Sequence, residues 1–255
     1  MYRNPFTLED KVIIITGASS GIGRQCAIVS SQLGAKVALI GRNSERLLET
    51  LNLMENNEKH YIYSIDLTEY EKINQIIEDI VIRFGKIKGV VNCAGISTTI
   101  AFDMIKPEKL NFLFQTNVQS AFNLTRIATK RSYFHEEGGS VIFISSVMGV
   151  VGEVGKSIYS VTKGALIALS KSLALELASR KIRVNCISPG VVDTPLSRNA
   201  IYSSFEESVE KIKAQHPLGI GLPEDVAYTC VFLLSDASRW ITGTNVIVDG
   251  GYLAK

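Results

Sequence analysis

A tyrosine, a lysine and a serine with the chemistry of a proton-transfer site lie close together in residues 145–166. Tyr159 and Lys163 are four residues apart in a segment of helical periodicity, so both side chains lie on one helix face. Ser146 follows the apolar run 140–144, which predicts a buried strand that ends in a turn. A phenol has a pKa of about 10, and a nearby ammonium group favours its ionised form. The three groups could exchange a proton at the end of a strand, although the same spacing also occurs on ordinary amphipathic helices.

A glycine-rich turn near the N-terminus is the second feature with chemical meaning. The β-branched run 12–16 is typical of a strand buried on both faces, and the sequence GASSGIG follows it. Helical spacing of apolar residues resumes after Gly23. In such a strand, turn and helix, glycines such as Gly17 and Gly21 let the backbone approach a pyrophosphate, whose charge the helix N-terminus stabilises. Taken alone, the glycines are equally consistent with a tight turn.

The residues after the second predicted strand indicate which dinucleotide would bind. An acidic residue at the end of strand 36–40 would accept hydrogen bonds from the adenosine ribose of NAD, but Gly41 and Arg42 stand there instead. An arginine at this place can pair with the extra phosphate of NADP. We therefore favour NADP(H) through Arg42 and keep NAD(H) as the alternative, in which Arg42 is simply solvated.

Strands and helices alternate along the chain, which predicts an α/β fold with a parallel sheet in a single domain of residues 1–255. One helix is expected to run from Pro107 to about Tyr133. The helix expected at 158–179 is apolar most of the way round, so we expect it to pack against a second subunit as well as the sheet. Residues 191–221 lack strong periodicity and are expected to form a substrate lid. The strands are expected at 12–16, 36–40, 60–65, 88–92, 140–144, 182–187 and 245–248.

Composition argues against several classes of function. The chain has 255 residues, 46% of them apolar, which is enough for the core of one large domain. Its 27 basic and 25 acidic residues give a net charge of +2, which argues against nucleic acid or an anionic membrane as a partner. No apolar run approaches the roughly 18 residues of a membrane span, so we expect a cytoplasmic protein. Four isolated cysteines and three dispersed histidines predict reduced thiols and no metal site.

Several short motifs occur in order along the chain: Thr16 to Gly23 (TGASSGIG), Asp66-Leu67, Asn92 to Gly95 (NCAG), Asn117, Ser146, Tyr159-x-x-x-Lys163 and Ser188 to Pro195 (SPGVVDTP). Together they resemble the short-chain dehydrogenase/reductase family over about residues 11–251, most closely its bacterial 3-oxoacyl-acyl-carrier-protein reductases. The resemblance implies a Rossmann-type doubly wound sheet of about seven parallel strands with helices on both faces, in a homotetramer. It also implies an NADP(H)-dependent oxidoreductase that interconverts a ketone or aldehyde and an alcohol.

The resemblance implies a catalytic role for each of four polar residues. Tyr159 would give a proton to the substrate oxygen in reduction or take one in oxidation, and Ser146 would hydrogen-bond and position that oxygen. Lys163 would stabilise the phenolate and hold the nicotinamide ribose, while Asn117 would support a water-linked proton relay. The hydride would come from the cofactor, which leaves the protein to orient and polarise the substrate.

The cofactor contacts also follow from the resemblance. Cys93 stands where the family usually has a second asparagine, and we expect this to affect stability rather than activity. Ser20 stands where NADP-preferring relatives often have a basic residue, which leaves Arg42 as the sole expected phosphate partner. The expected cofactor-binding residues are Gly17, Ser19, Ser20, Gly21, Ile22 and Gly23 at the diphosphate, Arg42, Asp66 and Leu67 at the adenosine, Asn92, Ala94 and Gly95 at the central ribose, Tyr159 and Lys163, and Pro189, Gly190, Val192 and Thr194 at the nicotinamide.

The sequence leaves the small-molecule substrate open. A largely apolar pocket would suit an acyl chain or a hydrophobic ketone, but a reductase of a sugar, polyol, steroid or other small ketone, including an NAD-dependent one, is a serious alternative. A catalytically silent dinucleotide-binding regulator and an epimerase or dehydratase acting on a nucleotide sugar are less favoured. The expected pocket residues are Ile96, Met148, Val150, Val151 and Leu196.

A carrier protein is an uncertain partner. The acyl-carrier-protein reductases dock their carrier with two arginines, which we expect near the mouth of the active site. Arg180 matches one of them, but Glu137 stands at the position of the other, beside Glu136. Two carboxylates would repel an acidic carrier protein, which weakens the expectation of a fatty-acid substrate.

Overall fold

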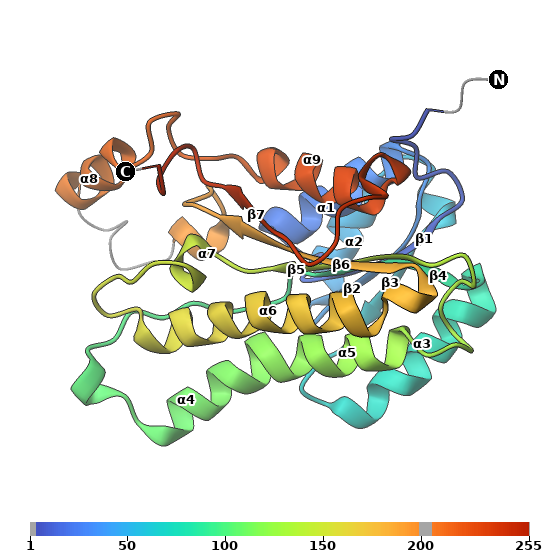
Figure 1. Cartoon of the computed structure of the whole chain (residues 1–255), viewed down its shortest axis with the longest axis horizontal. Helices are drawn as coiled ribbons and strands as arrows, with labels where there is room; N and C mark the ends of the chain where they lie inside the picture. The colour runs from blue at the N-terminus through green and yellow to red at the C-terminus, as the bar shows by residue number, and fades with distance from the viewer. Residues whose placement is uncertain (1–3, 199–205, 255) are drawn as a thin grey trace.

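One parallel sheet organises the part of the chain that the computed structural model describes, residues 4–198 and 206–254. The sheet has seven strands in the order β3-β2-β1-β4-β5-β6-β7 (Figure 1), and every neighbouring pair is parallel. The predicted doubly wound α/β fold is therefore confirmed. The strands are β1 (Val12–Thr16), β2 (Lys36–Gly41), β3 (Tyr61–Ser64), β4 (Ile87–Asn92), β5 (Gly139–Ile144), β6 (Ile182–Pro189) and β7 (Asn245–Val248).

Strand β1 lies at the centre of the sheet because its sequence suits burial on both faces. All five of its residues, VIIIT, are buried. Ile14 faces Ala38 of β2 on one side and Val90 of β4 on the other. Successive side chains point to opposite faces, so Ile14 joins one apolar core whereas Ile13 and Ile15 join the other.

Helices cover both faces of this sheet. Helices α1, α2 and α9 pack on one face, and α3, α5 and α6 pack on the other (Figure 1). Each layer contributes apolar residues to its own core, for example Cys26 and Cys230 on the first face and Ile77 and Leu166 on the second. The helices are α1 (Gly21–Gln32), α2 (Ser44–Asn52), α3 (Tyr70–Phe84), α4 (Pro107–Phe114), α5 (Ser120–Ala128), α6 (Ser157–Glu176), α7 (Pro195–Arg198), α8 (Glu206–Ala214) and α9 (Pro223–Leu234).

The helix expected from Pro107 to about Tyr133 is interrupted in the structure. Helix α4 ends at Phe114, one turn of π-helix spans Gln115–Gln119, and α5 ends at Ala128. Helical spacing of apolar residues continues through the wider turn, so the sequence pattern does not reveal it. The π-turn contains the buried Asn117.

Helix α6 is buried on one side only within a single chain. Leu166 and Ala174 join the core beneath the sheet. Leu175 is 82% exposed and Val161 is 54% exposed. Packing against the sheet therefore explains only part of the apolar sequence of this helix, and its expected contact with a second subunit stays a prediction.

The strand order places a crevice at the carboxyl edge of the sheet. Chain connections run outward from β1 towards β3 in one direction and from β4 towards β7 in the other. The helices that follow β1 and β4 consequently diverge, and open α/β sheets bind ligands in the crevice between them. The strand ends Thr16, Asn92, Ile144 and Pro189 meet at this edge.

The segment expected as a lid, residues 191–221, is described except for 199–205, which lie outside the described residues. It contains α7 and α8 rather than irregular chain alone. Buried His216 ties this segment to the sheet: its Nε2 accepts a hydrogen bond from the Val191 backbone N–H at 3.1 Å, and its Nδ1 lies 2.8 Å from the Ile212 carbonyl.

Across residues 4–198 and 206–254, no helix is both long enough and apolar enough to cross a membrane.

Three of the four cysteines are buried and Cys93 is half-buried. Burial raises the pKa of the Cys93 thiol, and the nearby Cys26 acts in the same direction. The Cys93 thiol is therefore protonated at neutral pH, and the buried cysteines serve as packing groups.

Candidate active site

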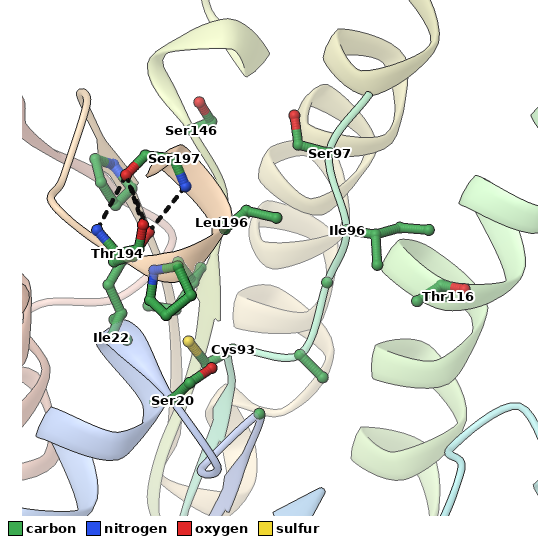
Figure 2. Close-up of a pocket in the computed structure, with 18 of the residues that line it drawn as sticks. Ser20, Ile22, Cys93, Ile96, Ser97, Thr116, Ser146, Thr194, Leu196 and Ser197 are labelled. Carbon is green, nitrogen blue, oxygen red and sulfur yellow. Dashed lines mark hydrogen bonds between the residues drawn. The ribbon is translucent and has the colours of Figure 1, made fainter. Parts of the chain in front are cut away.

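A cavity of about 440 Å³ occupies the crevice at the carboxyl edge of the sheet. Most of the residues predicted from the motifs line it together, although they come from segments far apart in the chain (Figure 2). Of the predicted catalytic and cofactor-binding residues, only Asn92 and Asn117 do not line it. The predicted residues that do are Gly17, Ser19, Ser20, Gly21, Ile22, Gly23, Arg42, Asp66, Leu67, Ala94, Gly95, Ser146, Tyr159, Lys163, Pro189, Gly190, Val192 and Thr194.

The turn between β1 and α1 has the shape and charge to hold a diphosphate. Gly17 has a φ of +66°, and a Cβ there would lie 3.0 Å from the Ala94 backbone nitrogen. A Cβ on Gly23 would lie 2.4 Å from the Gly17 carbonyl oxygen, so α1 packs on the turn more closely than any side chain allows. The first turn of α1 contains no acidic residue, and its N-cap Ser20 makes no capping hydrogen bond through its side chain. Backbone N–H groups and the positive helix end thus face the cavity, which fits the pyrophosphate of a dinucleotide.

The predicted adenosine end of the cavity carries two arginines and one carboxylate. Arg42 Nη1 lies 3.9 Å from Asp66 Oδ2, a long and exposed ion pair that holds the guanidinium weakly. The backbone N–H of Thr68 donates to Asp66 Oδ1 at 2.9 Å, and this bond is the main cause that lowers the pKa of the Asp66 carboxyl. Arg46, in the first turn of α2, also lines the cavity. The sequence did not indicate Arg46, because Arg42 precedes α2 and helical spacing does not relate the two residues.

Tyr159, the predicted proton donor, lies close to a serine and a lysine. Lys163 Nζ lies 5.7 Å from the centroid of the Tyr159 ring. Burial raises the pKa of Tyr159 to about 12, while a hydrogen bond with the Ser146 hydroxyl acts in the opposite direction. The phenol is therefore protonated at neutral pH, so Tyr159 can donate a proton.

Lys163 is anchored within the protein. Its Nζ donates a hydrogen bond to the Ile144 carbonyl at the end of β5, at 2.8 Å. Burial lowers the pKa of this ammonium group. A Cβ on Gly95 would lie 3.5 Å from the same Nζ, so the glycine keeps the space beside the lysine open. These contacts fix the ammonium group under the cavity, next to the tyrosine.

Asn117 braces the site from behind instead of lining it. Its side chain accepts a hydrogen bond from the Ile96 N–H at 2.8 Å and donates to the Ile96 carbonyl at 2.9 Å. It also donates to the Thr162 hydroxyl at 3.1 Å, and Thr162 donates to the Tyr159 carbonyl at 2.8 Å. The side chain thereby joins the segment after β4 to α6. The side-chain amide of Asn117 is thus engaged with other protein groups. Its part in a water-linked proton relay stays a prediction.

Asn92 also points away from the cavity. Its Nδ2 donates to the Thr125 hydroxyl of α5 at 3.0 Å, and the residue is 4% exposed. The central part of the cavity is lined instead by Cys93, Ala94 and Gly95. The backbone N–H groups of Cys93 and Ala94 donate to the Thr16 hydroxyl at 2.9 and 3.0 Å, which joins the ends of β4 and β1.

Ser197 fastens the predicted nicotinamide end. Its hydroxyl donates to the Val192 carbonyl at 2.7 Å and accepts from the Thr194 N–H at 3.0 Å. The Ser197 N–H in turn reaches the Thr194 hydroxyl at 3.2 Å, and Figure 2 draws the Thr194 and Ser197 bonds. Gly21 packs against this turn, because a Cβ there would lie 3.1 Å from Thr194 Cγ2. The turn after β6 and the glycine turn after β1 are therefore in contact.

The substrate side of the cavity is only partly the one expected. Ile96, Met148 and Leu196 line the cavity, and in Figure 2 the Leu196 side chain points toward the segment of Ile96 and Ser97, whereas the Ile96 side chain points away from Leu196 toward Thr116. Val150 and Val151 do not line it and are 51% and 37% exposed, so their assignment to the pocket is wrong. Polar lining residues that sequence reasoning missed are Ser97, Thr116, Glu153, Lys156 and Ser197.

The two residues considered for carrier docking lie at the other end of the sheet. Glu137 precedes β5 and Arg180 precedes β6, whereas the cavity is at the carboxyl ends of these strands. Glu137 pairs with Lys88 at 3.2 Å, and the Arg180 guanidinium donates to the Thr129 carbonyl. The expectation that they flank the mouth of the active site in one chain is therefore wrong.

Comparison with known proteins decides the family. A family model described as enoyl-(acyl carrier protein) reductase matches residues 17–253. The chain belongs to the short-chain dehydrogenase/reductase family. A crystal structure described as a short-chain alcohol dehydrogenase from Sinorhizobium meliloti superposes with a TM-score of 0.93 at 29% identity, over 99% of this chain and all of that one. This short-chain dehydrogenase/reductase is an oxidoreductase acting on CH–OH groups with NAD(P).

Three curated relatives of this short-chain dehydrogenase/reductase are named as 3-oxoacyl-acyl-carrier-protein reductases. The 3-oxoacyl-acyl-carrier-protein reductase FabG of Thermotoga maritima is 34% identical over 247 residues, 96% of this chain and 98% of the relative. The reductases of that name from Mus musculus and Escherichia coli are each 34% identical and cover 95% of this chain, and 98% and 97% of their own lengths respectively. The resemblance inferred from the motifs is therefore confirmed.

Proposed function

We propose that this chain reduces a ketone to a secondary alcohol with NADPH as the hydride source, and that Tyr159 gives the proton. The carrying observation is the common cavity wall of Tyr159, Ser146 and Lys163, where two hydroxyl groups and a buried ammonium meet. Ser146 and Tyr159 donate hydrogen bonds to one substrate oxygen, and Lys163 holds the ribose and the phenol. The bound cofactor supplies the hydride, and Pro189, Gly190, Val192 and Thr194 hold its nicotinamide end.

A carbonyl substrate fits this wall better than a carbon–carbon double bond. The matching family model carries the description enoyl-(acyl carrier protein) reductase, whereas the curated relatives named above are 3-oxoacyl reductases. Reduction of a ketone places negative charge on the ketone oxygen itself, and donors aimed at that oxygen stabilise the transition state. Ser146 and Tyr159 supply such donors, so we propose a 3-oxoacyl-type ketone.

The function can be tested by NADPH consumption. Steady turnover is expected with short 3-oxoacyl thioesters and small ketones, and none with the matching enoyl thioesters. Consumption with the enoyl compounds alone would replace the proposal by a double-bond reductase. Tight binding of NADPH without consumption across the carbonyl panel would instead indicate a dinucleotide-binding regulator.

The choice of cofactor can be tested at Arg42. We propose that its guanidinium, with Arg46 beside it, pairs with the 2′-phosphate of NADPH, because both line the adenosine end and the ion pair with Asp66 is long. Arg42→Ala is expected to weaken NADPH binding by about 1.5 to 3 kcal/mol, the usual size of a hydrogen bond to a charged group, and NADH binding much less. Calorimetric titration with both cofactors measures the difference. Arg126→Ala, an exposed arginine of α5, is the control, and equal losses for NADPH and NADH would refute the phosphate role.

We further propose that the chain is a single domain and that it forms a homo-oligomer, namely a homotetramer. The exposed apolar residues Val161 and Leu175 on α6, and Phe112 and Phe122 on the neighbouring helices, support a subunit contact on this side of the molecule. Light scattering of the full chain would show a monomer if the proposal is wrong.

We also propose that the described parts of 191–221 act as the substrate lid. Leu196 on α7 faces the cavity, while α8 is joined to the sheet edge through His216. A movement of α7 would open the cavity without loss of the bonds at His216, which suits a lid with one fixed end.

A further inference from the structure

Arg24 is a partly buried cation behind the glycine turn, and the proposed function gives it no task. It lies one turn into α1. Its Nη2 donates a hydrogen bond to the Ser19 carbonyl at 2.8 Å, and its Nε donates to the Thr50 hydroxyl at 3.0 Å. The same Nη2 pairs with Glu49 at 2.8 Å. Because Glu49 and Thr50 belong to α2, the Arg24 side chain joins the turn to this helix.

Thr50 binds the neighbouring peptide of the same turn. It is fully buried, and its hydroxyl donates a hydrogen bond to the Ala18 carbonyl at 2.9 Å, with a longer contact of 3.1 Å to the Arg46 carbonyl of its own helix. Within the part of the chain that the structure describes, no other hydrogen bond reaches the carbonyl of Ala18 or Ser19. Two consecutive carbonyls of the turn are therefore held by the side chains of Thr50 and Arg24.

These two contacts determine which way the N–H groups of the turn point. In a planar trans peptide, the carbonyl of one residue and the N–H of the next point in opposite directions. Ser19 and Ser20 line the cavity, where Figure 2 shows Ser20, whereas Arg24 and Thr50 are not among its lining residues. Carbonyls held behind the turn thus direct the N–H groups of Ser19 and Ser20 toward the cavity. Neither of these N–H groups donates a hydrogen bond to another described residue, so both can bind an anion.

The turn needs such contacts because its own backbone is permissive. Gly17 and Gly21 flank the two peptides, with φ of +66° and +54°. Glycine adopts many backbone conformations, so a segment between two glycines can turn its peptides over at low cost. A carbonyl oxygen facing the cavity would repel a phosphate, whereas an N–H group in its place binds one. The orientation of the peptides matters as much as the shape of the turn.

We propose that Arg24 and Thr50 are positioning residues that keep the N–H groups of Ser19 and Ser20 directed at the diphosphate of the cofactor. The inference rests on the proposed function, because it concerns the dinucleotide bound in the same cavity. Both side chains act through the backbone of the turn and touch no part of the cofactor. They serve NADP and NAD equally, since both carry the diphosphate, whereas Arg42 is proposed to distinguish them at the 2′-phosphate.

The test compares ligands with and without the diphosphate, by calorimetric titration of the full chain. NADP⁺ and NAD⁺ contain it, whereas adenosine 2′-monophosphate carries only the adenosine and the 2′-phosphate. In Arg24→Met, the dissociation constants of NADP⁺ and NAD⁺ are each expected to rise at least about tenfold, the effect of one lost hydrogen bond to a charged group. The affinity for adenosine 2′-monophosphate is expected to equal that of wild type, because this ligand does not reach the turn.

A matched pair of variants at Thr50 tests the same positioning with a smaller change. Thr50→Val keeps the shape of the side chain and removes the hydroxyl, so it is expected to weaken both dinucleotides. Thr50→Ser keeps the hydroxyl and is expected to bind them as wild type does. Arg24→Lys retains one donor group and is expected to restore part of the affinity lost in Arg24→Met. Arg126→Met, at an exposed arginine of α5, is the control and should change no affinity.

The pattern across the three ligands decides the inference. Equal losses for all three ligands would reduce Arg24 to a general structural role and overturn it. Losses for NADP⁺ and adenosine 2′-monophosphate with NAD⁺ unchanged would show that Arg24 acts through the arginines near α2, and would overturn it as well. So would unchanged dinucleotide affinity in Thr50→Val, which decides the matter if Arg24→Met does not fold. If no carbonyl compound is turned over, the proposed function fails, whereas these titrations still decide the inference. A wild-type chain that binds neither dinucleotide would overturn it.

Discussion

Replacing Tyr159 by phenylalanine is expected to lower kcat for ketone reduction by about 10²- to 10⁴-fold, the range that positioned general acids and bases contribute. The change keeps the ring near the ammonium groups of Lys156 and Lys163, whose Nζ atoms lie 6.0 and 5.7 Å from its centroid, and removes only the hydroxyl. The proton for the substrate oxygen must then come from solvent. Steady-state rates at saturating ketone and NADPH measure the loss.

The control for this change is Tyr228→Phe, which removes the hydroxyl of a tyrosine that is 59% exposed on α9. Its kcat should equal that of wild type. Full activity of Tyr159→Phe would remove the tyrosine from the mechanism and leave Ser146 as the nearest donor.

The same residue sets the expected pH dependence of wild type. Burial raises the pKa of Tyr159 to about 12, so the protonated phenol needed for reduction persists through the neutral range. Ketone reduction is therefore expected to be constant across neutral pH. Alcohol oxidation needs the phenolate, whose fraction increases as the pH approaches this pKa, so its rate should rise with pH. Rates in both directions from pH 6 to 10 check this, and an oxidation rate that falls with pH would contradict it.

Gly23→Ala is expected to lower kcat/KM by about 10²-fold, because the added Cβ would stand 2.4 Å from the Gly17 carbonyl oxygen. Backbone atoms cannot approach a side-chain carbon so closely, and the helix or the turn must move. A displacement approaching 1 Å at a binding element is enough for a loss of that size. The free energy of unfolding is expected to fall by about 1 to 3 kcal/mol, as for other overpacked sites.

Gly152→Ala separates this steric effect from the general effect of removing a glycine. A Cβ at this exposed position would meet no atom within 4 Å. Its kcat/KM and its thermal midpoint should match those of wild type. NADPH affinity of Gly23→Ala equal to that of wild type would show that the turn does not hold the diphosphate.

The sheet and the cofactor end of the cavity could be predicted because their residues have few alternatives. The run VIIIT fits only a fully buried strand, and the glycines after it permit contacts that no other residue allows. The spacing of Tyr159 and Lys163 along one helix similarly fixes their relative positions. Local patterns of this kind depend on neighbours in sequence, so they can be read without the tertiary structure.

The direction of Asn92 could also have been read from the sequence. Side chains alternate along β4, with Val90 in the core beneath α5 and Val91 in the opposite core. Asn92 must then face the same way as Val90, which brings it to Thr125 and away from the cavity. The family motif suggests a contact with the ribose, which stays a prediction, and the alternation of the strand indicates where the Asn92 side chain points.

Other features depend on distant parts of the chain and could not be predicted. The π-turn at Gln115–Gln119 keeps the periodicity of an ordinary helix. Lys156 reads as an ordinary solvated lysine in the sequence, but in the structure it is buried and its ammonium donates to Thr99, which comes from another crossover of the fold. His216 is likewise buried because its ring completes the bonding of the Val191 and Ile212 backbones.

Different kinds of chemical group line the two ends of the cavity, and this affects how its substrate specificity can change. At the cofactor end, glycines and backbone N–H groups form much of the surface, so substitutions there alter chain conformation. On the substrate side, Ile96, Leu196 and Lys156 contribute side chains from three separate segments, each anchored by its own backbone bonds. Exchange of these three side chains is therefore expected to change the substrate specificity and to leave the groups around the cofactor unchanged.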